Sequence, residues 1–170
     1  AEADTFSLER DYVLLASTHD DEDRQFFERW CRAGRHECLV IAPRHPERAD
    51  SIMRQLSSIK SNVSIARRSK GDAIAPATDV FLLDTVGELK NYFANAKLVI
   101  MGGSFVPVGG HNILEPASYH APVVTGPYME NVIDELELMK IHHAIEQLMN
   151  MKQMTTAITF LPDNEERRQA

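Results

Sequence analysis

Short apolar runs alternate along the chain with stretches in which apolar residues recur at helical spacing. The runs are rich in branched residues, which favour strands. Several are apolar throughout instead of at every second position, which is typical of strands covered on both faces. The predicted strands lie at residues 12–17, 38–42, 62–66, 79–84, 97–101 and 122–125. This alternation predicts an α/β fold with a parallel sheet of about six strands and helices on both faces.

The stretches between the runs predict the helices. They lie at residues 20–33, 46–57, 88–96, 116–120 and 131–141. The first has acids in its first turn and Gly34 just past its end, as the helix dipole and a left-handed C-cap favour. Beyond His142 the pattern weakens and is compatible with a strand and a helix. Because residues 163–170 resemble the beginning of another helix, we expect one domain, 1–170, truncated before its final helices.

Composition and charge narrow the class of protein. The 170 residues are 44% hydrophobic and 25% charged, which describes one globular domain and excludes collagen-like and disordered chains. The formal net charge of −7 provides no global field for nucleic acid or anionic lipid, so a bound anion would need local groups. Cys31 and Cys38 are too few for a disulfide scaffold or a zinc cluster, which favours a reduced compartment. With no apolar span or signal peptide, the chain is expected to be soluble.

Candidate chemistry lies just after the apolar runs, because ligands of open parallel sheets bind beyond the carboxyl ends of the strands. The glycine-rich stretch 102–112 has the strongest signal, since its two glycine pairs let backbone N–H groups approach an anion near a helix start. It predicts a phosphate cradle, with a long glycine-rich turn as the alternative. It matches neither a Walker A loop nor the dinucleotide-binding fingerprint.

Two glutamates near helix starts each allow two interpretations. Asn112 and Glu115 have capping-box spacing, but Pro116 favours the first helical position and would leave Glu115 free to bind ribose hydroxyls. Thr85 and Glu88 also have capping-box spacing, whereas Gly87 between them suggests a ligand close to the backbone.

Arginine, hydroxyl and histidine side chains at the strand ends complete the candidates. Arg44 and Arg48 are either a solvated pair or a fork for a phosphate or carboxylate. Ser17 and Thr18 either donate to the same anion or, as the favoured reading, cap the first helix. Histidines 19, 45 and 111 are candidate donors, but their spacing matches no zinc motif.

Five segments at the strand ends together resemble the carboxyl-terminal half of 3-deoxy-D-manno-octulosonic acid (Kdo) transferases. They are STHDDED, APRHPER, LDTVGEL, GGSFVPVGGHNILEPA and PVVTGP, and the similarity runs from about Tyr12 to Ala170. The resemblance implies one Rossmann-like half of a GT-B glycosyltransferase that binds the donor CMP-Kdo. The family often has a glycine soon after its Ser-Thr-His, where this chain has Asp20 and Asp21.

The resemblance also implies a donor-binding set, with Glu115 on the ribose and Arg44 near the cytosine or phosphate. The expected residues are Ser17, Thr18, Arg44, Gly87, Glu88, Gly103, Ser104, Gly109, Gly110, His111, Asn112 and Glu115. No metal and no cofactor are implied, since helix N-termini and cationic side chains can neutralise the leaving phosphate.

The implied activity is inverting transfer of Kdo from CMP-Kdo to the lipid A precursor at the cytoplasmic face of the bacterial inner membrane. The family's amino-terminal half carries the membrane anchor, the acceptor groove and the general base. We therefore expect this chain to lack a catalytic residue and to be inactive without that half. The alternatives are a GT-B-fold UDP-sugar epimerase domain and a non-catalytic nucleotide-binding module.

Overall fold

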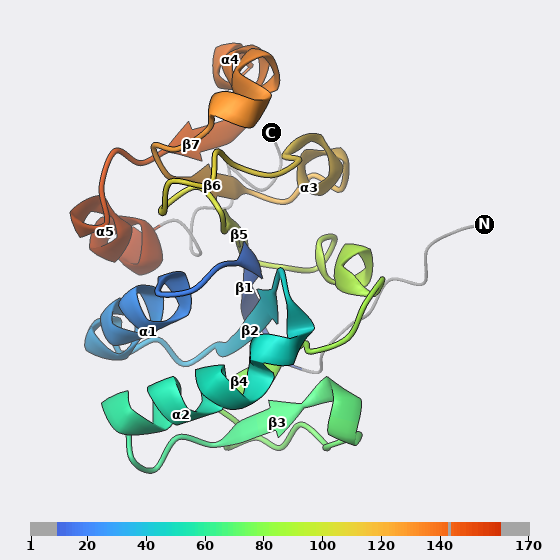
Figure 1. The fold of residues 1–170 in the computed structure, drawn as a ribbon, viewed down its shortest axis with the longest axis vertical. Coiled ribbons are helices and arrows are strands. Elements are labelled where there is room, and N and C mark those ends of the chain that lie inside the picture. Colours follow the sequence, from blue (N-terminus) through green and yellow to red (C-terminus); the bar gives the residue numbers. More distant parts are fainter. Residues whose placement is uncertain (1–9, 143, 161–170) are drawn as a thin grey trace.

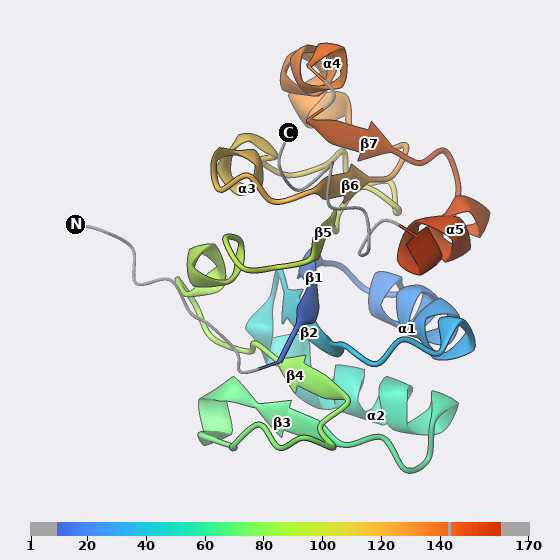
Figure 2. The same cartoon turned by 180° about the vertical axis from the view of Figure 1, so that it is seen from behind.

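The computed structural model describes residues 10–142 and 144–160, and a seven-stranded parallel sheet forms its centre (Figures 1 and 2). The strands are β1 (Tyr12–Thr18), β2 (Cys38–Pro43), β3 (Ile65–Arg67), β4 (Val80–Leu82), β5 (Leu98–Met101), β6 (Val123–Thr125) and β7 (Ile145–Gln147). Their order is β3-β4-β2-β1-β5-β6-β7. The α/β prediction is confirmed, with one strand more than six, because β7 forms in the weakly patterned stretch beyond His142.

Helices cover both faces of the sheet. They are α1 (Glu22–Ala33), α2 (Ala49–Ile59), α3 (Leu114–Ser118), α4 (Ile133–Ile141) and α5 (Lys152–Phe160), with 3-10 turns η1 (Pro46–Arg48), η2 (Arg68–Lys70), η3 (Leu89–Tyr92) and η4 (Glu130–Val132). One core lies against α1, α2 and α5, and the other lies against η3, α3 and α4 (Figure 1).

The two cores explain why the strands are apolar throughout. Successive side chains of β1 point to opposite faces, so Leu14 belongs to one core and Leu15 to the other. Both side chains are buried, as is every residue of β2. These runs lack alternating polar residues because helices cover both faces of the sheet.

The predicted helix at 88–96 is wrong. The segment instead forms η3 and a turn, with i to i+3 hydrogen bonds from Asn91 N–H to the Glu88 carbonyl and from Ala96 N–H to the Phe93 carbonyl. Tyr92 and Phe93 both lie in the core, where Tyr92 packs against Tyr12 and Phe81. The helix expected from residues 163–170 lies outside the described residues.

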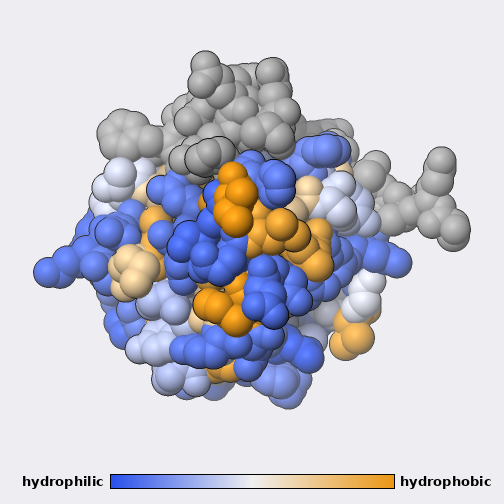
Figure 3. Space-filling model, turned by 90° about the horizontal axis from the view of Figure 1, so that it is seen from above, coloured by the Kyte–Doolittle hydropathy of each residue, from blue (hydrophilic) through white to orange (hydrophobic). Residues whose placement is uncertain are grey.

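The α4 end of the molecule carries exposed apolar side chains between charged ones. Figure 3 looks down on this end and shows apolar patches surrounded by hydrophilic residues. Ile133, Leu138 and Ile141 of α4 are 51%, 55% and 71% exposed. None of the described helices is long and apolar enough to cross a bilayer.

Candidate functional site

A cleft of about 370 Å³ lies at the carboxyl ends of β1, β2 and β4. Its lining comprises Ser17, Ala42, Pro43, Arg44, His45, Pro46, Leu83, Thr85, Val86, Gly87 and Leu89. Three of the predicted site residues, Ser17, Arg44 and Gly87, therefore meet in one place. The volume is within the range of small-ligand pockets, and the position is the edge where open parallel sheets bind ligands.

Left-handed backbone shapes the rim of this cleft. Ser17 has φ of 56° at the point where the pairing of β1 with β2 shifts, between Ala16 and Thr18. Gly87 has φ of 84°. A non-glycine residue in this region is strained, and such strain is concentrated at functional sites. The capping role favoured for Ser17 and Thr18 is wrong, because both belong to β1 and the N-cap of α1 is Asp21.

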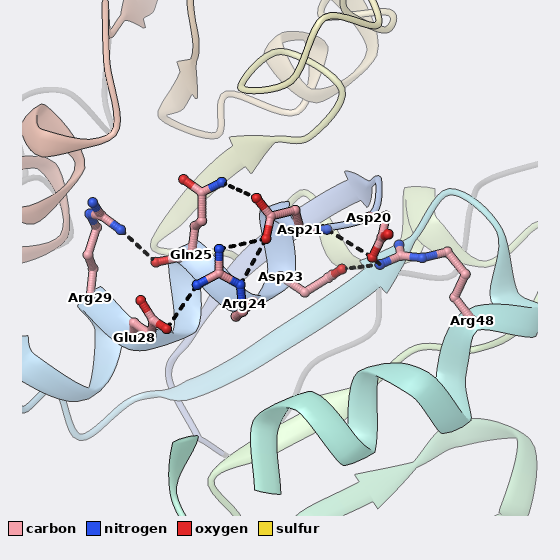
Figure 4. Close-up of polar contacts among 8 residues, drawn as sticks. All are labelled: Asp20, Asp21, Asp23, Arg24, Gln25, Glu28, Arg29 and Arg48. Carbon is pink, nitrogen blue, oxygen red and sulfur yellow. Dashed lines mark hydrogen bonds and ion pairs between the residues drawn. The ribbon is translucent and has the colours of Figure 1, made fainter. Parts of the chain in front are cut away.

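Asp21 stands where the β1–α1 turn requires a left-handed residue, with φ of 71°. Its carboxylate accepts hydrogen bonds from Arg24 Nε, at 2.8 Å, and from the Gln25 amide (Figure 4). A glycine would adopt this conformation at little steric cost. Asp21 therefore adopts a backbone conformation that favours glycine, and its side chain adds contacts to α1.

The two arginines near Pro46 have different environments. Arg48 donates to the buried carboxylate of Asp23 and, at 3.2 Å, to the Thr18 carbonyl. Arg44 is exposed, and its guanidinium has no hydrogen-bond or ion-pair partner among the described residues. Arg48 is therefore part of the scaffold, whereas Arg44 is available for a ligand anion.

Glu88 is engaged by an arginine that the sequence did not single out. Arg68 of η2 donates to both carboxylate oxygens, at 3.3 and 3.0 Å, and Thr85 Oγ1 donates to Oε1 at 2.6 Å. These bonds hold the pKa of Glu88 below its usual value, with the Arg68 bond as the first cause. The capping box is wrong, because Thr85 binds the glutamate side chain and Glu88 itself is the N-cap of η3.

The glycine-rich stretch offers its N–H groups to an internal anion. Gly103 N–H donates to Glu22 Oε1 at 2.8 Å, and Phe105 N–H donates to Oε2 at 3.0 Å. Ser104 is buried, donates to the Met101 carbonyl at 2.6 Å and accepts from Gly126 N–H at 2.8 Å. The predicted cradle therefore already holds a carboxylate, and Ser104 is satisfied within the fold.

The second glycine pair brings the loop onto the segment before α4. Gly109 and Gly110 have φ of 98° and 87°. A Cβ atom would lie 2.6 Å from the Asn131 side chain at Gly109 and 2.7 Å from Met129 Sδ at Gly110. These glycines are therefore needed for close packing and for left-handed backbone.

Helix α3 begins earlier than predicted. It starts at Leu114, whose N–H donates to Asn112 Oδ1 at 2.9 Å, and Pro116 is its third residue. The first helical hydrogen bond is made by Ala117 N–H to the Ile113 carbonyl, so proline at the third position removes none. Both expected helix starts are therefore wrong, although Glu115 is exposed.

Three histidines from separate loops lie together beside the cleft. His19 Nε2 and His111 Nε2 are 2.8 Å apart, and their rings stack with centroids at 5.0 Å. His45, which lines the cleft, meets His19 edge-on at 5.7 Å. Burial is the first cause that lowers the pKa of His19 and His111, and neighbouring histidines and Arg44 add to the effect.

The histidine pair predicts acid sensitivity. A histidine whose folded pKa lies below its unfolded value of 6.5 takes up a proton more readily when unfolded. The contribution of the pair to the free energy of unfolding should therefore be fully present above pH 6.5. It should be lost as the pH drops from 6.5 through the folded pKa values. The melting temperature between pH 7.5 and 5 tests this, with His111→Gln expected to flatten the profile. His36→Gln, at an exposed histidine before β2 and outside the pair, is the control for loss of an imidazole elsewhere.

The histidines are not part of a metal-ligand group in the part of the chain that the structure describes. Within residues 10–142 and 144–160, no three His, Cys, Asp or Glu side chains are grouped as metal ligands. The 2.8 Å contact between His19 and His111 uses one ring nitrogen of each in a shared hydrogen bond.

Sequence reasoning missed three residues that organise this edge: Glu22, Asp23 and Arg68. The first two lie in an acidic run that predicts only a helix start, and that start is confirmed. The spacing did offer a signal for these two acids. They precede Phe26 and Phe27 by three to five positions, which places them on the buried face of the helix. Arg68 has no such signal, since its partner Glu88 is 20 residues away.

Several known proteins are similar to this chain. No family model matches it. A "3-deoxy-D-manno-octulosonic acid transferase" of Bordetella pertussis is 37% identical over 132 residues, covering 74% of this chain and 30% of that protein. One of Aquifex aeolicus is 33% identical over 123 residues, covering 72% and 33%. The chain thus spans about a third of the length of these curated relatives.

Solved structures are similar over nearly the whole chain. The "C-terminal CMP-Kdo binding domain of WaaA" from Acinetobacter baumannii has a TM-score of 0.87 and 30% identity, covering 94% of this chain and 84% of that one. A spinosyn rhamnosyltransferase, SpnG, has a TM-score of 0.57 at 12% identity and shares the fold alone. Sequence and fold agree, and the chain therefore belongs to the Kdo transferase family, with the fold of the family's carboxyl-terminal domain.

Proposed function

We propose that this chain is the donor-binding domain of a glycosyltransferase that moves Kdo from CMP-Kdo to the lipid A precursor. The observation that carries the proposal is the cleft, which brings Ser17, Arg44 and Gly87 together in a fold shared with a CMP-Kdo binding domain. The exposed Arg44 guanidinium would bind the donor phosphate or cytosine, and the hydroxyl of Ser17 would donate to the same group.

The remaining expected donor residues would act from around this cleft. Glu88 adjoins it through Thr85, and His111 adjoins it through His19 and His45. Glu115 is exposed at α3 and would accept hydrogen bonds from the ribose hydroxyls. Thr18, Gly103, Ser104, Gly109, Gly110 and Asn112 would shape the loops that carry these groups.

The transfer would be inverting and would need no metal, cofactor or nucleic acid, with Arg44 and backbone N–H groups balancing the charge of the departing CMP. The amino-terminal part of the polypeptide would supply the general base, the lipid acceptor groove and contact with the cytoplasmic face of the inner membrane. The domain alone would therefore bind CMP without transferring Kdo. Transfer by the isolated 170 residues would contradict this division of labour.

A nucleotide titration followed through backbone amide signals tests the proposal. CMP should shift the amides of Ser17, Arg44 and Gly87 in a saturable way, whereas UMP and AMP should not. Arg44→Ala should weaken CMP binding about tenfold to a hundredfold, since it removes a charge-assisted hydrogen bond. Glu115→Ala should weaken it less, by the loss of the ribose contact.

Arg54→Ala, at an exposed arginine of α2, is the matched control and should bind CMP as the wild type does. A preference for UMP would favour the UDP-sugar epimerase alternative. Equal shifts with all three nucleotides would favour a non-specific nucleotide module.

A further inference from the structure

Glu22 is a buried carboxylate held by the backbone of two separate loops. Its side chain is only 2% exposed at the start of α1. Oε1 accepts N–H groups from His19 and Gly103, both at 2.8 Å, and Oε2 accepts the N–H of Phe105 at 3.0 Å. The β1–α1 turn and the glycine-rich loop after β5 are thus joined through one side chain.

These contacts place an anion where a glycine-rich loop could otherwise take one from solution. Three N–H groups that converge on a point form an anion-binding concavity. Burial disfavours the ionised carboxyl and raises the pKa of Glu22, while the three backbone bonds oppose that shift. The glycine-rich loop is therefore tied to α1 by contacts within the protein.

The histidine pair depends on the same junction. His19 lies in the β1–α1 turn and donates its own N–H to Glu22, and Gly103 lies directly against both rings. A Cβ atom at Gly103 would be 2.6 Å from the His111 ring and 3.3 Å from the His19 ring. A shift of Gly103 would therefore change the 2.8 Å contact between the two imidazoles.

We propose that Glu22 is a positioning residue for the donor site, whose carboxylate fixes the glycine-rich loop and the His19–His111 pair beside the cleft. Glu22 itself touches no ligand, because its oxygens face backbone N–H groups of the protein. This inference rests on the proposed function in one respect, that the loop and the pair lie at the edge where CMP would bind.

The test compares Glu22→Gln with Glu28→Gln, which removes a carboxylate from the same helix. Glu28 is partly exposed and pairs with Arg24 at 3.0 Å, away from the glycine-rich loop. A glutamine at position 22 retains one acceptor oxygen and turns an NH₂ group toward a backbone N–H. Oε1 of Glu22 accepts two N–H groups and Oε2 accepts one, so at least one N–H must lose its partner whichever oxygen the NH₂ group replaces.

The first measurement uses the ligand-free chain. Glu22→Gln should shift the amide signals of His19, Gly103 and Phe105 and the ring nitrogen signals of His19 and His111, whereas signals of α2 and β2 stay in place. Glu28→Gln should leave all of these unchanged. Unchanged histidine and loop signals in Glu22→Gln would overturn the proposal.

The second measurement is CMP affinity. Glu22→Gln should bind CMP about tenfold more weakly, because part of the binding free energy, about 1.4 kcal/mol, would be spent on returning the loop and the histidine pair to their positions. Displaced loop signals with unchanged affinity would also overturn the proposal. A wild-type chain that binds no CMP contradicts the proposed function instead, and the ligand-free spectra then decide whether Glu22 fixes the loop.

Rescue by a small anion distinguishes positioning from general stability. Glu22→Ala leaves three N–H groups around an empty space, which formate can enter and chloride fits less well. Formate should restore the His19 and His111 ring signals and the CMP affinity toward the wild-type values. Equal effects of formate and chloride would show that the carboxylate shape is irrelevant and would overturn the proposal.

Discussion

Arg48→Met is expected to lower the free energy of unfolding by about 3–5 kcal/mol, because it leaves a buried carboxylate without its cation. The Asp23 side chain is 0% exposed, and the Arg48 guanidinium donates to it across the junction of α1 and η1 (Figure 4). Burial raises the pKa of Asp23, and Arg48 opposes that shift. Methionine would keep an unbranched apolar stem at this position while it removes the charged guanidinium.

Urea denaturation of Arg48→Met measures this loss. Arg24→Met is the matched control, since Arg24 pairs with Asp21 at 2.7 Å but both side chains are exposed, and it should cost about 0–1 kcal/mol. Asp23→Leu combined with Arg48→Met should recover much of the stability, because no charge is then buried. A loss for Arg48→Met as small as that for Arg24→Met would show that the buried pair contributes little.

Gly102→Ala is expected to destabilise the fold strongly, because Gly102 lies directly against the backbone of β1. A Cβ atom there would lie 2.5 Å from the Ser17 carbonyl oxygen and 2.6 Å from Thr18 Cα. Both atoms are backbone, and Gly102 N–H also donates to the Ala16 carbonyl, so neither strand can move aside without loss of pairing. We expect a loss of about 3 kcal/mol, the upper part of the range for overpacked sites.

Thermal and urea unfolding of Gly102→Ala test this expectation. Gly71→Ala is the control, because a Cβ atom at Gly71 meets nothing within 4 Å and only the φ of 68° is unfavourable. That conformational strain should cost about 1–2 kcal/mol. If both variants lower the free energy of unfolding by the same amount, the close approach of Gly102 to β1 does not contribute to the loss. Since Ser17 lines the cleft, the displaced strand of Gly102→Ala should also weaken CMP binding.

Local pattern was a good guide to the strands and to the ends of the strands. The run at β2 is apolar throughout because both of its faces are buried, so periodicity alone identifies it. The same logic failed at residues 88–96, where the spacing of apolar residues resembles a helix although η3 forms. There, the packing of Tyr92 against Phe81 and Tyr12 decides the backbone, and those partners come from other strands.

The candidate site divides in the same way. Ser17, Arg44 and Gly87 could be selected in advance because each follows an apolar run, and parallel strands bring their carboxyl ends to one edge. The roles of Glu22 and Glu88 could not be predicted from the ends of the apolar runs. Capping-box spacing at Thr85 and Glu88 is a local rule, and the fork of Arg68 overrides it with a stronger, charge-assisted contact from another segment.

The α/β class, six of the seven strands, the family resemblance and the edge at which a ligand would bind all follow from patterns of neighbouring residues. The folded chain was needed to show that Arg48 binds a buried carboxylate while Arg44 has no partner among the described residues, that His19 and His111 share a hydrogen bond, and that Glu22 binds the glycine-rich loop. The difference lies in how far apart in the sequence the interacting residues are. Strand and helix patterns depend on residues that are neighbours in the sequence. The partner of a charge or of an N–H group depends instead on residues that only folding brings together: Glu22 and Gly103 are 81 residues apart, and His19 and His111 are 92 apart.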